Sequence, residues 1–178
     1  KKIVKKGLER LGVNVLGVMP YQPMLTFPTM RQILEETNFN VFSGNQCLDN
    51  YISKIIIGAM EPHNALNFMS QNSLLITPGD REDLIMTAIG LHISKAAVCP
   101  TQIAGMVLTG GFQPHQEVIG VIKDTNIPVL TTELDTYTAA SLIHDLTVKI
   151  RPQDEKKIEA VKNMVKEYVD IESMLKWI

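Results

Sequence analysis

The sequence predicts an α/β fold with a mainly parallel sheet, and three short apolar runs within residues 73–147 carry this prediction. The runs lie at 74–76, 103–108 and 127–130, and each is rich in branched side chains. Each run ends in small or polar residues and is followed by apolar residues at helical spacing. A repeated order of strand, polar loop and helix is typical of parallel strands that are buried on both faces.

Composition and charge limit the classes of function. The chain has 178 residues, of which 45% are hydrophobic and 20% charged, as expected for one globular domain or one domain plus a fragment. A net charge of −2 favours neither a nucleic-acid partner nor an anionic membrane surface. No apolar run approaches the ~20 residues of a membrane-spanning helix, and no signal peptide is present. We therefore expect a cytoplasmic protein in which Cys47 and Cys99 are reduced thiols.

The residues before the central region predict short elements separated by glycine and proline. Gly12 ends a helix with a basic last turn, Pro20 cannot continue a strand, and Pro28 suits the first turn of a helix. The elements expected here are a helix end at 1–12, a strand at 13–18, a helix at 28–38, an extended step at 41–42, a strand at 52–60 and a short helix at 62–69.

The helices after the three apolar runs have recognisable beginnings. Asp80 and Asp135 are predicted N-caps of the first and third of these helices, and Pro114 opens the second. After residue 150 the pattern becomes more charged. Asp154 is predicted to cap a helix that extends to Tyr168, and a short amphipathic tail follows.

The common catalytic and cofactor motifs are absent from the sequence. It contains no GxxxxGK[ST], GxGxxG, HExxH or GxSxG pattern, and no EF-hand loop. The four histidines are far apart and show no metal-ligand spacing. The residues therefore predict no catalytic group, no metal site and no cofactor for this segment.

Polar residues follow all three central runs, and the carboxyl ends of parallel strands meet at one edge of a sheet. Two glycines allow backbone N–H groups to approach an anion, the helix N-termini are partly positive, and Arg81 can hold a phosphate or carboxylate with two hydrogen bonds. The predicted ligand-binding residues are Asp80, Arg81, Thr109, Gly110, Gly111, Thr131, Asp135 and Thr136, with Thr132 beside them.

A purely structural interpretation explains the same residues. Asp80 and Asp135 suffice as helix caps, Arg81 can bridge to a neighbouring carboxylate, and Gly110–Gly111 can form a tight turn from strand to helix. Both interpretations stay open at this point.

The pair Asp80-Arg81 together with Thr109-Gly110-Gly111 resembles the DRTGG domain, which is named for these residues. The likeness continues through 127–129 and 135–136. Upstream, residues 15–20 and 58–60 resemble the junction in long bacterial phosphate acetyltransferases. The resemblance extends from about residue 13 to 177.

This resemblance implies a three-layer α/β/α sandwich similar to the N-terminal domain of HPr kinase/phosphorylase. It divides the chain into a remnant of a P-loop domain with a connecting segment (1–70), a DRTGG core (71–150) and C-terminal helices that pack on the core (151–178). It also implies a dimer, an adjacent dethiobiotin-synthetase-like P-loop domain and, in a longer parent chain, an acetyltransferase domain. The P-loop and DRTGG domains also occur without the acetyltransferase domain, as shorter stand-alone proteins. Related pyrophosphatases carry the domain beside modules that bind adenine nucleotides. The family provides no catalytic residue that could be transferred to this sequence.

Three hypotheses follow. The first is a non-catalytic regulatory and dimerisation module that senses a small anionic metabolite, a nucleotide or an acyl phosphate. The second is a segment of a phosphate acetyltransferase that contributes to a composite active site. The third is a purely structural interaction domain. For a dimer surface, the sequence-based candidates are the helix faces that carry Met86 and His92, with the packing next to Met106.

Overall fold

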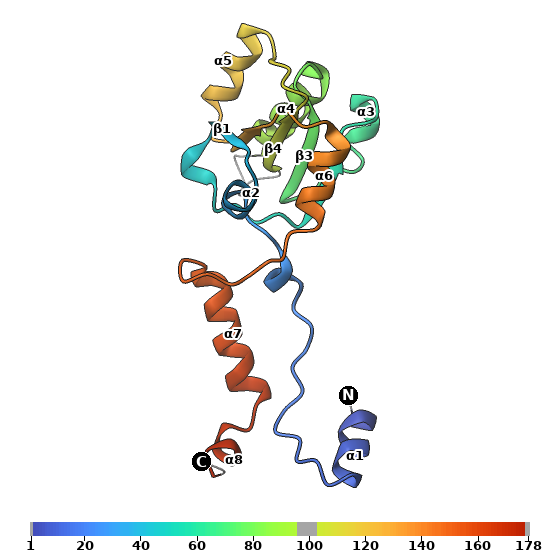
Figure 1. The fold of residues 1–178 in the computed structure, drawn as a ribbon, viewed down its shortest axis with the longest axis vertical. Helices are drawn as coiled ribbons and strands as arrows, with labels where there is room; N and C mark the ends of the chain where they lie inside the picture. Colours follow the sequence, from blue (N-terminus) through green and yellow to red (C-terminus); the bar gives the residue numbers. More distant parts are fainter. Residues whose placement is uncertain (1, 96–102, 177–178) are drawn as a thin grey trace. The chain divides into compact units, whose positions relative to one another are not determined.

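The computed structural model describes residues 2–95 and 103–176, and these form two compact units. The first, here called the sheet unit, is Phe27–Val148. The second, here called the terminal unit, combines Lys1–Thr26 with Lys149–Ile178. Each unit is described by itself (Figure 1).

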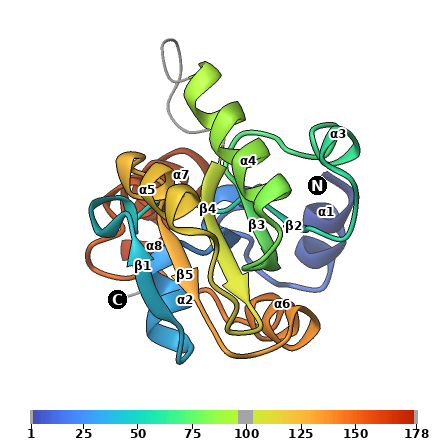
Figure 2. The same cartoon turned by 90° about the horizontal axis from the view of Figure 1, so that it is seen from above.

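The described part of the sheet unit contains a five-stranded sheet with the order β1-β5-β4-β3-β2 (Figure 2). β1 is antiparallel to β5, and the other neighbours are parallel, which confirms the predicted mainly parallel sheet. The strands are β1 Asn40–Ser43, β2 Lys54–Ile57, β3 Ser73–Pro78, β4 Ile103–Thr109 and β5 Val129–Thr131.

Helices cover both faces of this sheet, so the fold has three layers. One core cluster joins the sheet to α3, α4 and α5, and the other joins it to α2 and α6. The helices of this unit are α2 Met30–Glu36, α3 Pro62–Ala65, α4 Glu82–Lys95, α5 Gln116–Asp124 and α6 Thr136–His144, with a 3-10 turn at Asn45–Cys47.

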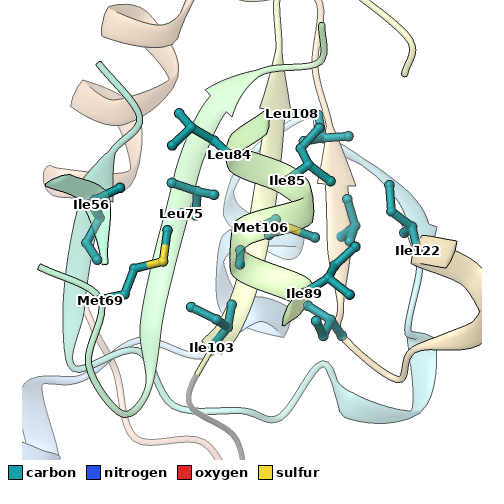
Figure 3. Close-up of a cluster of buried hydrophobic side chains, with 14 residues drawn as sticks. Ile56, Met69, Leu75, Leu84, Ile85, Ile89, Ile103, Met106, Leu108 and Ile122 are labelled. Carbon is teal, nitrogen blue, oxygen red and sulfur yellow. The ribbon is translucent and has the colours of Figure 1, made fainter. Parts of the chain in front are cut away.

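Side chains of the central strands alternate between the two core clusters. Leu75 packs beneath α4 with Leu84 and Ile85 (Figure 3), whereas Leu74 and Ile76 face the α2 and α6 side. All five side chains are fully buried. This alternation within one apolar run is what a strand buried on both faces requires, and it explains why the runs lack a polar side.

Local sequence signals begin the helices as expected, with shifts of one or two residues. The helix expected from Pro28 begins at Met30, because the Thr29 hydroxyl accepts from the Gln32 N–H while the Gln32 side chain accepts from the Thr29 N–H. The second central helix begins after His115, whose Nδ1 accepts from the Glu117 N–H.

The terminal unit has helices and almost no sheet. Its elements are α1 Lys2–Arg10, a 3-10 turn at Pro23–Thr26, α7 Glu155–Tyr168 and α8 Ile171–Leu175. Gly12 follows α1 with φ +77°, as expected of a residue that ends a helix. The strand predicted at 13–18 is wrong: Gly17 makes one isolated bridge to Val169, and the Asp170 N–H donates to the Leu16 carbonyl at 2.7 Å. Without a second strand of comparable length, the apolar run has no ladder to join.

The limits of the sheet unit differ from the divisions expected from the sequence. A boundary at residue 71 would separate β1 and β2 from the strands with which they pair, and the compact unit begins instead at Phe27. Residues 151–178 belong to the same compact unit as the first 26 residues. Cys47 is a free thiol, and Cys99 lies outside the described residues.

Candidate functional site

The three predicted loops do lie together at the carboxyl edge of the sheet. Pro78 pairs with Thr109, and Leu108 pairs with Thr131, so β3, β4 and β5 end side by side. The Gly79 N–H donates to the Thr109 carbonyl at 3.2 Å. We call residues 78–81, 109–112 and 131–136 the carboxyl rim.

The two glycines of the rim use their N–H groups within the protein. The Gly110 N–H donates to the Leu134 carbonyl at 2.8 Å, and the Gly111 N–H donates to the Thr132 carbonyl at 3.1 Å. Both glycines have a positive φ, +77° and +69°, which the turn requires and which other residues rarely adopt. Both N–H groups therefore already have acceptors within the protein, and the predicted anion-accepting concavity stays a prediction. They tie the loop after β4 to the loop after β5.

Arg81 also bonds within the protein. Its Nε and one Nη donate to the two carboxylate oxygens of Asp83 at 2.9 and 2.8 Å. The same guanidinium donates to the carbonyls of Met60 at 3.0 Å and Gly58 at 3.4 Å. The hydrogen bond with Asp83 raises the pKa of Arg81 and lowers the pKa of the Asp83 carboxyl. Arg81 thus joins the start of α4 to the loop that follows β2, and its side chain stays partly exposed.

The rim hydroxyls pair with one another. The hydroxyls of Thr109 and Thr136 lie 2.7 Å apart, and Thr109 is fully buried. The Thr132 hydroxyl accepts from the Leu134 N–H at 3.2 Å, and Thr131 is half-buried at the end of β5. Because Thr109 and Thr136 bond to each other and not to a base, the arrangement does not activate either hydroxyl as a nucleophile.

The two predicted caps behave differently. Asp135 caps α6, accepting from the Thr138 N–H at 3.0 Å and from the Thr138 hydroxyl at 2.6 Å. Both bonds lower the pKa of Asp135, and the bond from the Thr138 hydroxyl has the larger effect. Asp80 is exposed and stands one residue too early: α4 begins at Glu82, and the carbonyl of Arg81 accepts the first helical N–H groups.

Carboxylates dominate the surroundings of the rim. Glu61 and Asp80 both act on Arg81 through their charge, and the Glu82 carboxylate accepts from the His115 N–H at 2.6 Å. Glu133 lies over Gly111. This excess of negative charge comes from residues adjacent to the predicted site and was not part of the sequence-based prediction. Within the residues described, no group of histidines, cysteines and carboxylates is arranged to hold a metal ion.

A small hollow of about 260 Å³ opens beside the rim, between the end of α2, the start of β1 and the loop after β5. Asn38, Phe39 and Asn40 were not among the predicted site residues, because no motif marks them and only the antiparallel pairing of β1 with β5 brings them here. Its lining residues are Asn38, Phe39, Asn40, Thr132, Glu133, Leu134 and Leu142.

Comparison with known proteins agrees with this fold and this motif. Residues 32–146 match the DRTGG domain family, and the chain belongs to that family. The matched segment spans all five strands of the sheet unit. Among the helices of the described chain, none has the length and apolar content to cross a bilayer.

The chain is similar to part of several bacterial phosphate acetyltransferases. It is 32% identical to that of Nitratidesulfovibrio vulgaris over 86% of the chain and 22% of the relative, and 29% identical to that of Pseudomonas putida over 88% and 22%. The chain therefore spans about a fifth of the length of these relatives.

A solved structure shares the fold. It contains the CBS and DRTGG domains of the regulatory region of a Clostridium perfringens pyrophosphatase, complexed with the activator diadenosine tetraphosphate. The TM-score is 0.54 at 19% sequence identity, covering 93% of this chain and 69% of the other.

Proposed function

We propose that this chain is a non-catalytic regulatory and dimerisation module of a phosphotransacetylase-like protein. The proposal rests on one observation: the residues that define the family form hydrogen bonds within the protein. Arg81 donates to Asp83 and to carbonyls of the loop after β2, while Gly110 and Gly111 donate to the loop after β5. Groups bonded in this way hold three loops in place and have a structural role, not a catalytic one.

The surrounding chemistry supports a role without catalysis. A general base must lie within hydrogen-bond reach of the proton that it removes. At the rim, the hydroxyl of Thr109 faces that of Thr136. Beyond the rim, the Nδ1 of His115 accepts the Glu117 N–H as the cap of α5. These groups serve the fold.

The similarity to phosphate acetyltransferases supports a longer parent protein with an acetyltransferase domain beside this module, and the family resemblance adds an adjacent P-loop domain. Helix α1 adds support, because it has one apolar face and its side chains from Ile3 onward are all exposed. An exposed apolar helix face of this kind suits packing against a neighbouring domain.

An assay of acetyl transfer between acetyl-CoA and phosphate by the purified chain tests the absence of catalysis. We expect no turnover above the buffer control. Turnover that is retained by the chain but lost in a folded Arg81→Ala variant would contradict the proposal. Sedimentation of the same sample tests dimerisation, for which we expect a dimer at micromolar concentration.

Sensing of a nucleotide or acyl phosphate at the rim is the second candidate function. It is favoured by the nucleotide activator in the related pyrophosphatase structure and by the partly exposed guanidinium of Arg81. The carboxylates of Asp80, Asp83 and Glu133 oppose a bare anion, so we expect binding only of a ligand that arrives with a divalent cation.

Thermal unfolding in the presence of ligands tests this second function. A nucleotide with Mg²⁺ at ~100 times its dissociation constant should add ~2.7 kcal/mol to the free energy of unfolding. The same measurement is repeated with acetyl phosphate, with acetyl-CoA, and with the nucleotide in the presence of EDTA, which removes the divalent cation. No shift with any of them excludes sensing by this chain, and a shift that persists in Arg81→Ala places the ligand away from the rim.

A further inference from the structure

The hollow beside the carboxyl rim combines an open apolar surface with polar side chains at its mouth. Its volume is about 260 Å³, and it lies between the end of α2, the start of β1, the loop after β5 and α6. Phe39 is buried in its wall, whereas Leu134 and Leu142 are exposed by 36% and 45%. Small-molecule sites usually enclose about 300–1,000 Å³, so this hollow has the size for a single side chain.

The glycines of the family motif hold one wall of the hollow in place. The Gly110 N–H donates to the Leu134 carbonyl, and the Gly111 N–H donates to the Thr132 carbonyl. The Leu134 N–H in turn donates to the Thr132 hydroxyl at 3.2 Å. A Cβ on Gly111 would overlap with the carboxylate of Glu133, so only glycine leaves room for that side chain. The wall is therefore preorganised, which is a property of binding sites.

Three hydrogen-bonding side chains of the hollow have no partner among the residues that the structure describes. They are the amides of Asn38 and Asn40 and the carboxylate of Glu133, and all three are exposed. The ion pairs within the described chain do not include Glu133, and Arg81, the cation of the rim, is bonded to Asp83. The hollow therefore offers a carboxylate and two amide oxygens to a donor from outside the chain.

We propose that this hollow is a docking site for an arginine side chain of a partner protein. The aliphatic stem of the arginine lies against Leu134 and Leu142, as long charged side chains do on apolar surfaces. Its guanidinium donates to the carboxylate of Glu133 and to the amide oxygens of Asn38 and Asn40. This inference goes beyond the proposed function, because it needs neither the absence of catalysis nor dimerisation.

Charge complementarity selects this occupant. The carboxylates of Glu61, Asp80 and Glu133 make the surroundings of the rim negative. A purely apolar side chain would cover the Glu133 carboxylate without pairing it, which costs free energy. Lysine supplies the charge as a compact, strongly hydrated ammonium, whereas the guanidinium presents five N–H donors in one plane and is more weakly hydrated. Arginine therefore matches a carboxylate beside two amides on an apolar surface.

Titration of the chain with three capped tripeptides tests the site. Each peptide has a central residue between two glycines, and this residue is arginine, lysine or citrulline, which has the shape of arginine without its charge. Nuclear magnetic resonance follows the amide signals of Asn38 and Asn40 and the methyl signals of Leu134 and Leu142. We expect saturable shifts with the arginine peptide, with a dissociation constant in the millimolar range, and at least about ten-fold weaker binding of the citrulline peptide.

Two matched variants test the role of the carboxylate. Glu133→Gln removes the charge and keeps the shape, and Glu117→Gln makes the same change at an exposed position of α5, on the other face of the sheet. We expect Glu133→Gln to weaken binding of the arginine peptide at least about ten-fold and Glu117→Gln to leave it unchanged. Both side chains are exposed, so both variants should stay folded, which thermal unfolding checks.

Several outcomes overturn the proposal. The absence of saturable shifts with the arginine peptide excludes the site. Equal binding of the citrulline peptide, or binding that survives Glu133→Gln, removes charge from the recognition, and equal binding of the lysine peptide removes the guanidinium. Sedimentation gives a separate readout: weaker self-association of Glu133→Gln than of Glu117→Gln would make the occupant a second copy of this chain and not a different protein.

Discussion

The sheet unit and the terminal unit contain similar apolar patterns with opposite outcomes. In the sheet unit, α4 presents Leu84 and Ile85 to the sheet, and both are fully buried. In the terminal unit, α1 is more sharply amphipathic in sequence, yet its apolar side chains are exposed, Leu11 just after it by 80%. The difference teaches that an apolar pattern specifies a helix face, and that only a tertiary partner converts this face into a core.

The largest expected effect tests this contrast directly. Leu75→Ala removes a fully buried side chain between β3 and α4, and we expect it to lower the free energy of unfolding by about 2–5 kcal/mol. Leu11→Ala removes the same atoms from an exposed position and should change it by less than about 0.5 kcal/mol. Urea denaturation measures both. Similar losses for the two variants would show that α1 is covered in solution.

The same contrast explains how much of the fold the sequence could predict. The runs at 74–76, 103–108 and 127–130 became β3, β4 and β5, because each is apolar enough to be buried on both faces. The run at 13–18 looked similar but formed one bridge through Gly17. A Cβ at Gly17 would lie 2.2 Å from the Tyr168 carbonyl, a close approach that periodicity does not reveal.

The position of the candidate site was predictable, but its chemistry was not. Parallel strands bring the three loops to one edge regardless of detail. Whether the Gly110 N–H is free depends on the Leu134 carbonyl, and whether Arg81 is free depends on carbonyls of the loop after β2, both distant in sequence. For the glycines, Arg81 and Asp135, the structural interpretation in terms of turn, bridge and cap describes the bonds that form.

A smaller effect separates two exposed ion pairs, of which only one has additional hydrogen bonds to backbone carbonyls. Arg31 contacts both carboxylate oxygens of Asp49, at 2.7 and 2.9 Å, much as Arg81 contacts Asp83. Arg81 additionally bonds the carbonyls of Gly58 and Met60, so we expect Arg81→Ala to cost about 1–2 kcal/mol. Arg31→Ala should cost less than about 1 kcal/mol. Denaturant titration compares them, and equal costs would mean that the two backbone contacts contribute nothing.

The smallest expected effect concerns two helix caps of the same kind, one in each unit. Asp135 accepts from the N–H and hydroxyl of Thr138 at 3.0 and 2.6 Å, and Asp170 accepts from those of Ser173 at 3.0 and 2.7 Å. These hydrogen bonds lower the pKa of both carboxyls in the folded protein. A carboxyl whose pKa is lowered by folding stabilises the folded state at a pH above its pKa in the unfolded chain, which is about 3.9. This stabilisation is lost as the pH falls through the pKa of the carboxyl in the folded protein.

Helix α6 packs on the core of the sheet unit, so Asp135→Ala should lower the midpoint temperature of thermal unfolding at neutral pH. Because the variant lacks the carboxylate that titrates, its midpoint should also fall less than that of the unchanged chain between about pH 5 and pH 2. Asp170→Ala should leave that midpoint unchanged, because α8 is a short exposed helix whose loss does not expose the sheet unit's core. Faster amide exchange confined to α8 would confirm that its cap acts locally. An equal fall of the midpoint in both variants would show that the two units unfold together.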